Sequence, residues 1–240
     1  MATNPIAIKT IVYAILGGVV PAIFWLWFWL HEEDRDNPEP MGLIALTFFM
    51  GALCVIVAIA LERFAQNIIP LRNLQIVAWA GIEEIVKYLG VLVIIKGSSA
   101  IKEPIDYPMY FIACALGFAA LENVLFLIEP LSTSGAIVGA LTGNLRFLGS
   151  TLLHAIASGM IGSALGLSFY KGWFAKKTYV LVGTVTAITL HSLFNFFIMK
   201  GSGENFLQVF GFLWIVAIIN ILIFEKLKRM GKETLPLPIS

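Results

Sequence analysis

The chain has 240 residues, of which 59% are hydrophobic and 13% are charged, and its net charge is +1. Soluble domains carry about 25% charged residues, so this composition indicates an integral membrane protein. Neither a Lys/Arg-rich block nor an acidic tail occurs, and the sequence therefore argues against nucleic acid as a partner.

Apolar runs long enough to cross a bilayer as helices follow one another along the chain. They predict an all-α, polytopic membrane helix bundle in which residues 1–240 form a single integral membrane domain. Residues 132–144 contain Gly135, Gly139 and Gly143, a spacing that lets helices pack closely, and are predicted to form a short interfacial or re-entrant helix. The seven spans are predicted at about residues 6–30, 41–61, 73–95, 108–128, 145–170, 179–199 and 206–224.

The alternative is eight spans, with residues 132–144 crossing the membrane. The basic C-terminal tail is predicted to be cytoplasmic, but the distribution of Lys and Arg gives the same tally for both topologies. At about 1.5 Å per residue, seven spans bring Glu83, Glu122, His154 and His191 to one level toward the outer face. Because isolated intramembrane charges are costly, we expect this topology, with the N-terminus outside.

The third span carries two adjacent carboxylates and an ammonium at a depth where water is scarce. Each central charge costs about 2.5–3.5 kcal/mol, so such residues usually face a protein interior and have a function. On a helix, Lys87 lies within side-chain reach of both Glu83 and Glu84. The two Glu are about 100° apart around the axis, and we expect them to play different parts.

Polar side chains also occur in three later spans. Taken singly, each has a structural interpretation: a packing histidine, a glutamate at the interface, or an arginine that reaches the headgroups. Together, three Glu and two His converge at one depth from four helices, as metal, acid–base or proton-path chemistry requires. These later residues are Glu122 with Asn123, Arg146 with His154, and His191 with Asn195. Arg146 and His154 are eight residues apart and are expected on roughly the same side of a helix, and His191 and Asn195 are four residues apart.

At these residues the chain resembles the PrsW family of intramembrane proteases, whose superfamily also holds CAAX prenyl proteases and bacteriocin-processing membrane proteases. The family pattern is EExxK, then FxxxEN, then an Arg followed by a His, and finally a late His. Here FxxxE replaces the FxxxH of the CAAX enzymes, which argues against prenyl-protein processing. The matching residues are Glu83 to Lys87, Phe118 to Asn123, Arg146 with His154, and His191.

The resemblance implies an endopeptidase that cleaves a single-span membrane protein, for example an anti-sigma factor, near the outer face. The lipid bilayer is a second partner, and the expected location is a bacterial or archaeal plasma membrane, with the C-terminus cytoplasmic. The residues expected to be catalytic are Glu83, Glu84, His154 and His191. The residues expected to support them are Lys87, Glu122, Asn123, Arg146 and Asn195.

Two chemistries remain open, and the cofactor is either absent or zinc. Without a metal, Glu83 or Glu84 activates water together with a His, while His191 and Asn195 hydrogen-bond the developing oxyanion. With a metal, zinc would polarise the carbonyl and lower the pKa of its water. No HExxH motif occurs in the sequence. The ligands expected for zinc are Glu84, Glu122, His154 and His191.

Two other classes of protein share part of this pattern. A proton-coupled transporter also uses intramembrane Glu, Lys, His and Arg, but the sequence has no inverted repeat and no pair of broken helices. A non-catalytic membrane assembly subunit could keep buried histidines for helix packing, but the adjacent Glu83 and Glu84 would then have no purpose. Proteolysis is therefore the favoured interpretation.

Overall fold

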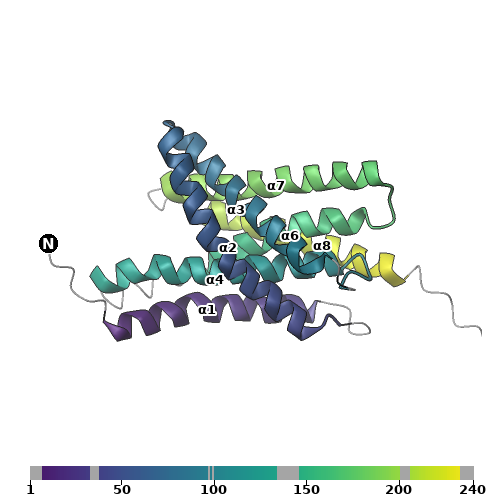
Figure 1. The fold of residues 1–240 in the computed structure, drawn as a ribbon, viewed down its shortest axis with the longest axis horizontal. Helices are drawn as coiled ribbons and strands as arrows, with labels where there is room; N and C mark the ends of the chain where they lie inside the picture. The colour runs from purple at the N-terminus through teal and green to yellow at the C-terminus, as the bar shows by residue number, and fades with distance from the viewer. Residues whose placement is uncertain are drawn as a thin grey trace, which may run out of the picture.

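The computed structural model describes residues 7–32, 38–96, 98, 100–133, 146–200 and 206–232. Every regular element in these ranges is helical, so the predicted all-α architecture is confirmed (Figure 1). The π-helix η1 continues directly into α6. The elements are α1 (Ile8–His31), α2 (Met41–Ile68), α3 (Arg72–Ile95), α4 (Asp106–Thr133), η1 (Arg146–Thr151), α6 (Leu152–Leu167), α7 (Trp173–Lys200) and α8 (Phe206–Lys232).

In the described part of the chain, six helices are long and apolar enough to cross a membrane, namely α1, α2, α4, α6 with the end of η1, α7 and α8. The helix α3 has 24 residues but carries Glu83, Glu84 and Lys87 in its central turns. The structure thus supports an integral membrane protein with six such helices. Whether α3 is the seventh span belongs to the proposal below.

Successive helices run in alternating directions, and all but α2 and α3 lie roughly along the long axis of the molecule (Figure 1). The helix α1 begins at the left of this view and α8 ends at the right. The helices α2 and α3 form an antiparallel pair that crosses the other helices obliquely. The pair therefore lies across the bundle, and α3 contacts α4, α6 and α7.

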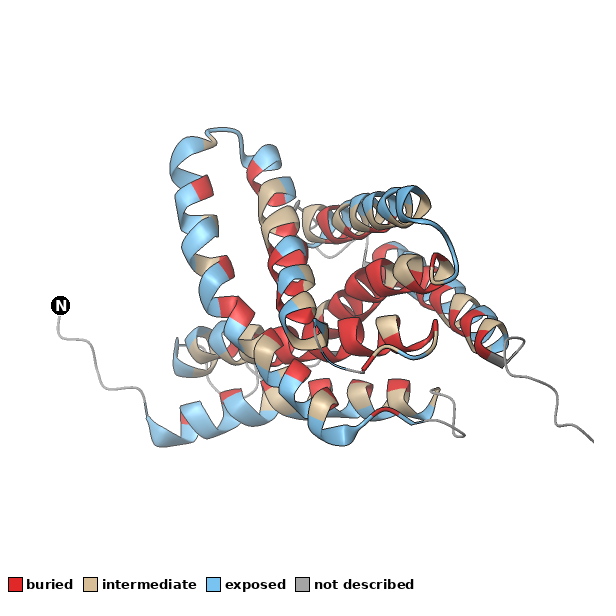
Figure 2. Ribbon diagram, turned by 45° about the vertical axis from the view of Figure 1, so that its right-hand side comes forward, coloured by how far each residue is buried: buried red, intermediate tan, exposed pale blue. Residues whose placement is uncertain are grey.

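The helix α4 lies in the middle of the bundle, where it packs against α1, α2 and α6. Every residue from Pro108 to Ala120 is buried, and so is every residue from Thr151 to Gly159 in the neighbouring η1 and α6. Figure 2 shows these buried residues in the centre and exposed residues along the outer helices. A helix that is apolar all round is expected to be enclosed in this way.

The oblique crossing of α2 over α4 depends on two glycines. A Cβ atom at Gly51 of α2 would collide with the carbonyl oxygen of Cys114, and one at Gly117 of α4 would collide with that of Phe48. Small residues at helix crossings in membranes let the two backbones approach closely. This contact fixes how the α2–α3 pair lies against α4.

The helices α2, α4, α7 and α8 each extend several residues beyond the predicted spans, because an apolar run ends where the membrane ends but a helix does not have to. The helix α2 continues from Leu61 to Ile68, so the predicted connection over residues 62–72 is mostly helical. The helix α7 begins at Trp173, before the predicted span of residues 179–199, and the basic tail is the end of α8. The predicted interfacial helix over residues 132–144 lies outside the described residues, except for its start in α4.

Candidate active site

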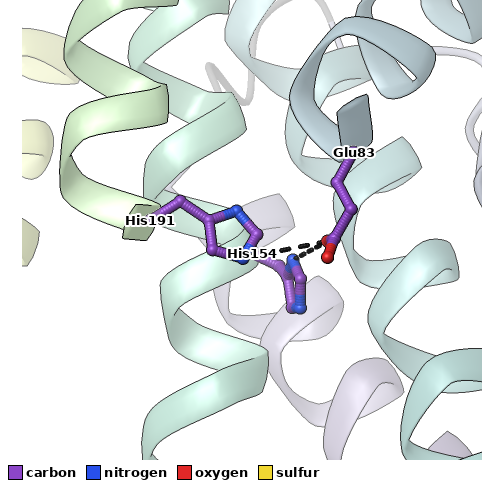
Figure 3. A group of neighbouring side chains, drawn as sticks. All are labelled: Glu83, His154 and His191. Carbon is purple, nitrogen blue, oxygen red and sulfur yellow. Dashed lines mark ion pairs between the residues drawn. The ribbon is translucent and has the colours of Figure 1, made fainter. Parts of the chain in front are cut away.

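Six polar side chains from four helices meet near the middle of the bundle, and we call them the carboxylate–imidazole cluster. Five of them are buried, and the side chain of Glu122 is 18% exposed. Figure 3 shows how His154 and His191 approach Glu83 from two other helices. The members of the cluster are Glu83, Glu84 and Lys87 of α3, Glu122 of α4, His154 of α6 and His191 of α7.

Lys87 is the ammonium group of this cluster, and none of its side chain reaches solvent. Its Nζ atom lies 2.8 Å from Glu84 Oε1, 3.4 Å from Glu83 Oε2 and 2.8 Å from His154 Nδ1. It also lies 4.2 Å from the centre of the Phe118 ring, a cation–π contact. One buried cation thus holds both carboxylates of α3 and a histidine of α6 in place.

Glu84 is enclosed on all sides, with no exposed surface. Its Oε1 atom accepts from Lys87 at 2.8 Å and lies 2.9 Å from His191 Nδ1. Its Oε2 atom accepts a hydrogen bond of 2.6 Å from the Ser158 hydroxyl. Since both oxygens are engaged by the protein, Glu84 is suited to orienting its neighbours rather than to meeting a substrate.

The partners of His191 determine its tautomer. An ionised carboxylate can only accept hydrogen bonds, so the contact with Glu84 places the ring hydrogen on Nδ1. The Nε2 atom then keeps its lone pair and lies 3.8 Å from Glu83 Oε2. His191 therefore offers a base or a ligand atom on the side that faces Glu83.

His154 is held in the opposite tautomer. An ammonium can only donate, so Nδ1 accepts from Lys87 and the ring hydrogen lies on Nε2. This Nε2 atom is 3.1 Å from Glu122 Oε2, which accepts its hydrogen. The Nδ1 atom lies 3.8 Å from Glu83 Oε2. His191 thus directs a nitrogen lone pair toward Glu83, whereas the lone pair of His154 Nδ1 is directed to Lys87.

Glu83 is the carboxylate on which the two imidazoles converge (Figure 3). The rings of His154 and His191 are nearly perpendicular, at 87°, and their centres are 5.0 Å apart. One oxygen of Glu83 and one nitrogen of each ring lie within 4.8 Å of one another. This arrangement can hold a water molecule between the Glu83 carboxylate and His191 Nε2, or it can bind a metal ion if the ion displaces Lys87 from His154.

The donor set fits a catalytic metal ion. Catalytic zinc sites commonly have three protein ligands and keep a further position open. Metal-bound histidines usually donate their other ring hydrogen to a carboxylate, as His191 does to Glu84 and His154 does to Glu122. A metal ion on Glu83 and His154 would, however, compete with the ammonium of Lys87 for both.

Residues 39–222 match the family described as PrsW family intramembrane metalloprotease. The match covers more than half of the 240 residues and includes the whole carboxylate–imidazole cluster. The chain belongs to the PrsW family of intramembrane proteases. It is therefore a membrane-embedded hydrolase, as the resemblance in the sequence implied.

Relatives named Protease PrsW are similar to the chain over most of its length. The protein of Shouchella clausii (strain KSM-K16) is 27% identical over 224 residues, which cover 92% of this chain and 98% of the relative. The protein of Bacillus subtilis (strain 168) is 24% identical, with 88% and 89% covered. That of Clostridioides difficile (strain 630) is 23% identical, with 90% and 91% covered. No solved structure matches the chain.

The zinc ligands expected in this PrsW-family chain differ from the atoms that converge. Glu84 and Glu122 were expected to bind the metal, but they lie against the far ring nitrogens of His191 and His154. Glu83 takes the central position instead. The rotation of α3 about its axis decides which of the two adjacent carboxylates lies close to both His154 and His191 and which contacts the far nitrogen of His191, and tertiary packing sets that rotation.

The other predicted supporting residues are Asn123, Asn195 and Arg146. Asn123 is buried, and its amide donates to the Thr151 hydroxyl at 2.9 Å, which links α4 to the turn before His154. Asn195 is half-buried on α7, one turn after His191. Arg146 begins η1, but its side chain lies outside the described part of the structure.

The π-helix η1 changes one geometric prediction. Arg146 and His154 were expected to point roughly the same way because they are eight residues apart on an α-helix. The interval instead contains the six π-helical residues Arg146–Thr151, whose hydrogen bonds span one residue more than those of an α-helix. The α-helical spacing therefore does not apply. Such π-turns occur frequently at functional sites, and this one ends three residues before His154.

Sequence reasoning missed two polar residues of the PrsW-family site. Ser158 lies four residues after His154, and this spacing on one helix face was the available signal. Glu62 of α2 lies close enough to Glu83 and Glu122 to interact with them electrostatically. Glu62 was missed because the second span was expected to end at Leu61.

Proposed function

We propose that the chain cleaves a single-span, membrane-anchored protein by means of a water molecule that Glu83 activates. The observation that supports this assignment best is the position of Glu83 Oε2, which is 3.8 Å from His154 Nδ1 and 3.8 Å from His191 Nε2. Acid–base catalysis needs a base within hydrogen-bond reach of the attacking water. An anti-sigma factor with one transmembrane segment is an example of such a substrate.

In this mechanism the water lies between Glu83 and the lone pair of His191 Nε2, since the lone pair of His154 Nδ1 already accepts from Lys87. Glu83 takes a proton from the water, and the water oxygen attacks the carbonyl carbon of the peptide bond. The same proton then passes to the leaving nitrogen as the carbon–nitrogen bond breaks. The products are a carboxylic acid and an amine, and Glu83 returns to its ionised form. The new acid then gives its proton to the amine, which leaves a carboxylate and an ammonium group.

The remaining members of the cluster keep this geometry fixed. Glu84 holds His191 through Nδ1, Glu122 holds His154 through Nε2, and Lys87 contacts Glu83, Glu84 and His154. Groups oriented in advance in a site of low polarity stabilise a developing charge without reorganising. The ring hydrogen of His191 is on Nδ1 and is directed to Glu84. We therefore assign the hydrogen bond that stabilises the oxyanion to the Asn195 amide.

The description of the PrsW family as metalloproteases makes a metal ion part of this proposal. Its ligands would be Glu83, His154 and His191, and the ion would lower the pKa of its bound water and polarise the substrate carbonyl. Glu84 and Glu122 keep the same task in either chemistry, since each orients one imidazole. The metal-free mechanism uses the same residues with Glu83 alone as the base.

The proposed topology has seven spans within one membrane domain, with α3 as the additional span. The alternating directions of the helices support it, because α1 begins on one side and α8 ends on the other (Figure 1). Lys102, Lys177 and Lys228 lie at the α8-end side, and Lys9 and Arg72 lie at the opposite side. By the positive-inside rule the α8-end side is cytoplasmic, and the N-terminus is outside a plasma membrane.

The proposed depth of the site follows from this orientation. Glu122 and His191 each lie nearer to the end of their helix than to its start, and His154 lies nearer to the start of η1. These three helix ends are on the side where α1 begins (Figure 1). We therefore assign cleavage to the outer half of the membrane.

The test is cleavage by the purified protein in lipid vesicles that contain candidate single-span substrates. Wild-type protein should cut a substrate near its outer membrane boundary, and Glu83→Gln, which keeps the size of the side chain, should not. Mass spectrometry of the fragments locates the cleaved bond. A Glu83→Gln protein that cleaves at the wild-type rate would exclude Glu83 as the activating residue.

A further inference from the structure

The helix α6 contributes a second polar group to the site, one turn after His154. The hydroxyl of Ser158 donates to Glu84 Oε2 at 2.6 Å, and neither residue has any exposed surface. The spacing of four residues places His154 and Ser158 on one face of α6. Through this face, α6 contacts both carboxylates of α3, since His154 faces Glu83 and Ser158 binds Glu84.

The Ser158 hydroxyl donates to a different kind of acceptor from those of other hydroxyls in these helices. A Ser or Thr within a helix commonly donates to the carbonyl oxygen four residues earlier. Thr47, Thr189 and Ser192 do so here, with bonds to Leu43, Val185 and Ile188. Ser158 instead donates across to another helix, and its acceptor is a charged oxygen. Hydrogen bonds to ionised acceptors are about twice as strong as those between neutral groups.

We propose that Ser158 is a positioning residue for proteolysis, which fixes the Glu84 carboxylate so that Glu84 can orient His191. This inference rests on the proposed function, in which His191 directs Nε2 toward the attacking water. Ser158 itself touches neither the water nor the substrate.

The physical reason is the freedom of a carboxylate to rotate. The last torsion of a Glu side chain is broad, so the plane of the carboxylate is set by its partners. On one side, Oε1 is shared between Lys87 and His191. On the other side, Ser158 holds Oε2. Without the hydroxyl, Oε2 would be a buried acceptor that has lost a donor, and the carboxylate would turn away from His191 to find another.

The chain offers a matched control for the substitution Ser158→Ala. Ser163 lies on the same helix, is also buried, and donates to Asn220 Oδ1 of α8 at 3.2 Å, outside the cluster. Ser163→Ala therefore removes the same atom and a hydrogen bond to another helix. Any general cost of losing a buried hydroxyl from α6 should appear in both variants.

The expected result is a loss of turnover in Ser158→Ala alone. Loss of a partner that orients a metal-bound histidine typically costs about 10–100-fold in metal affinity or activity, and we expect a decrease of this size here. We expect this decrease in kcat with little change in KM, whereas Ser163→Ala should retain wild-type kinetics. Ser158→Thr, which keeps the hydroxyl, should recover activity. Should Ser158→Ala fail to accumulate, Ser158→Cys keeps a similar volume with a weak donor and should show the same loss.

A spectroscopic measurement reports on His191 without any substrate. The chain has three histidines, so the imidazole region of a ¹⁵N spectrum of histidine-labelled protein contains three residues, and His31→Gln removes the exposed one. The ¹⁵N shifts show which ring nitrogen carries the hydrogen. We expect Ser158→Ala to change the His191 signals and Ser163→Ala to leave them unchanged.

The outcomes separate this inference from the proposed function. If the wild-type protein cleaves its substrate and Ser158→Ala matches Ser163→Ala in both kcat and His191 signals, Ser158 has no positioning role. If the wild-type protein cleaves none of the substrates, the proposed function fails, and the ¹⁵N comparison still decides whether Ser158 controls His191.

Discussion

Glu83 and Glu84 are neighbours in the sequence but approach opposite nitrogens of the same histidine. Glu84 Oε1 lies 2.9 Å from His191 Nδ1, and Glu83 Oε2 lies 3.8 Å from His191 Nε2. The imidazole is thus placed between two adjacent carboxylates of one helix. The first carboxylate faces the proposed position of the water, and the second is enclosed by protein.

Because Glu83 and Glu84 have different surroundings, the same Glu→Gln substitution should have different effects at the two positions. Glu83→Gln should abolish cleavage with little loss of stability, because Lys87 keeps its 2.8 Å pair with Glu84. Glu84→Gln should also reduce cleavage, but it leaves Lys87 without its nearest charge partner. Breaking a buried ion pair typically costs about 3–5 kcal/mol. Thermal unfolding in detergent measures the difference, and equal melting temperatures for the two variants would contradict it.

Replacing His191 or Asn195 of α7 by alanine should leave different amounts of activity. His191→Ala should abolish cleavage, because His191 supplies the nitrogen facing Glu83 in either chemistry. Asn195→Ala should leave a measurable remainder, since loss of one oxyanion donor typically lowers kcat by about 10²–10³. Single-turnover cleavage rates compare the two. An active His191→Ala enzyme would remove this histidine from the site.

Lys87 should oppose metal binding, because its ammonium contacts Glu83 Oε2 and His154 Nδ1, which are two of the three converging ligand atoms. We expect Lys87→Met to bind zinc more tightly than the wild-type protein, as measured by titration and by metal analysis of the purified protein. Adding His154→Ala should remove the gain. Unchanged zinc binding in Lys87→Met would show that the ammonium does not compete for these atoms.

Orientation in the membrane can be read by labelling single cysteines in a chain whose buried Cys54 and Cys114 are replaced. Lys9 at the start of α1 and Lys177 near the start of α7 are both exposed. With seven spans and the N-terminus outside, Lys9→Cys should react with an impermeant reagent on intact cells. Lys177→Cys should react only after permeabilisation. The reverse pattern would overturn the proposed orientation.

The crossing of α2 over α4 should tolerate no side chain at Gly51. A Cβ atom there meets the backbone of Cys114, whereas a Cβ atom at Gly42 of the same helix meets nothing within 4 Å. Gly51→Ala should strongly lower the melting temperature and the amount of protein that accumulates. Gly42→Ala should be neutral or stabilising by up to about 1 kcal/mol, because Ala favours helix. Similar stabilities for both variants would show that the crossing can relax.

Much of the site could be predicted because charges inside a membrane are costly. Glu83, Glu84, His154 and His191 stood out against apolar surroundings, and their common depth implied that they meet. The roles of the two carboxylates could not be predicted in the same way. They depend on the rotation of α3, which follows from packing between residues distant in the sequence, such as Gly90 of α3 with Cys54 of α2.

The fold, like the site, could be predicted from the sequence only in part. Apolar runs located the helices, because the bilayer requires about 20 consecutive apolar residues. They did not locate the polar helix ends, so Glu62 was assigned to a connection although α2 continues to Ile68. The π-turns of η1 had no signal in the hydrophobic pattern either, since the turn width depends on the backbone rather than on composition.

The buried position of Lys87 also has a consequence for biogenesis. The partners that neutralise or hydrogen-bond the charged groups of α3 include Glu122, His154, Ser158 and His191, and all of them are synthesised after α3. In a nascent chain that ends before α6, the three charged groups of α3 lack these partners. The translocon is therefore expected to insert α3 poorly into the bilayer. We therefore expect α3 to settle into the bilayer only when the later helices arrive, so that a truncated chain is recognised by quality control before it can hydrolyse anything.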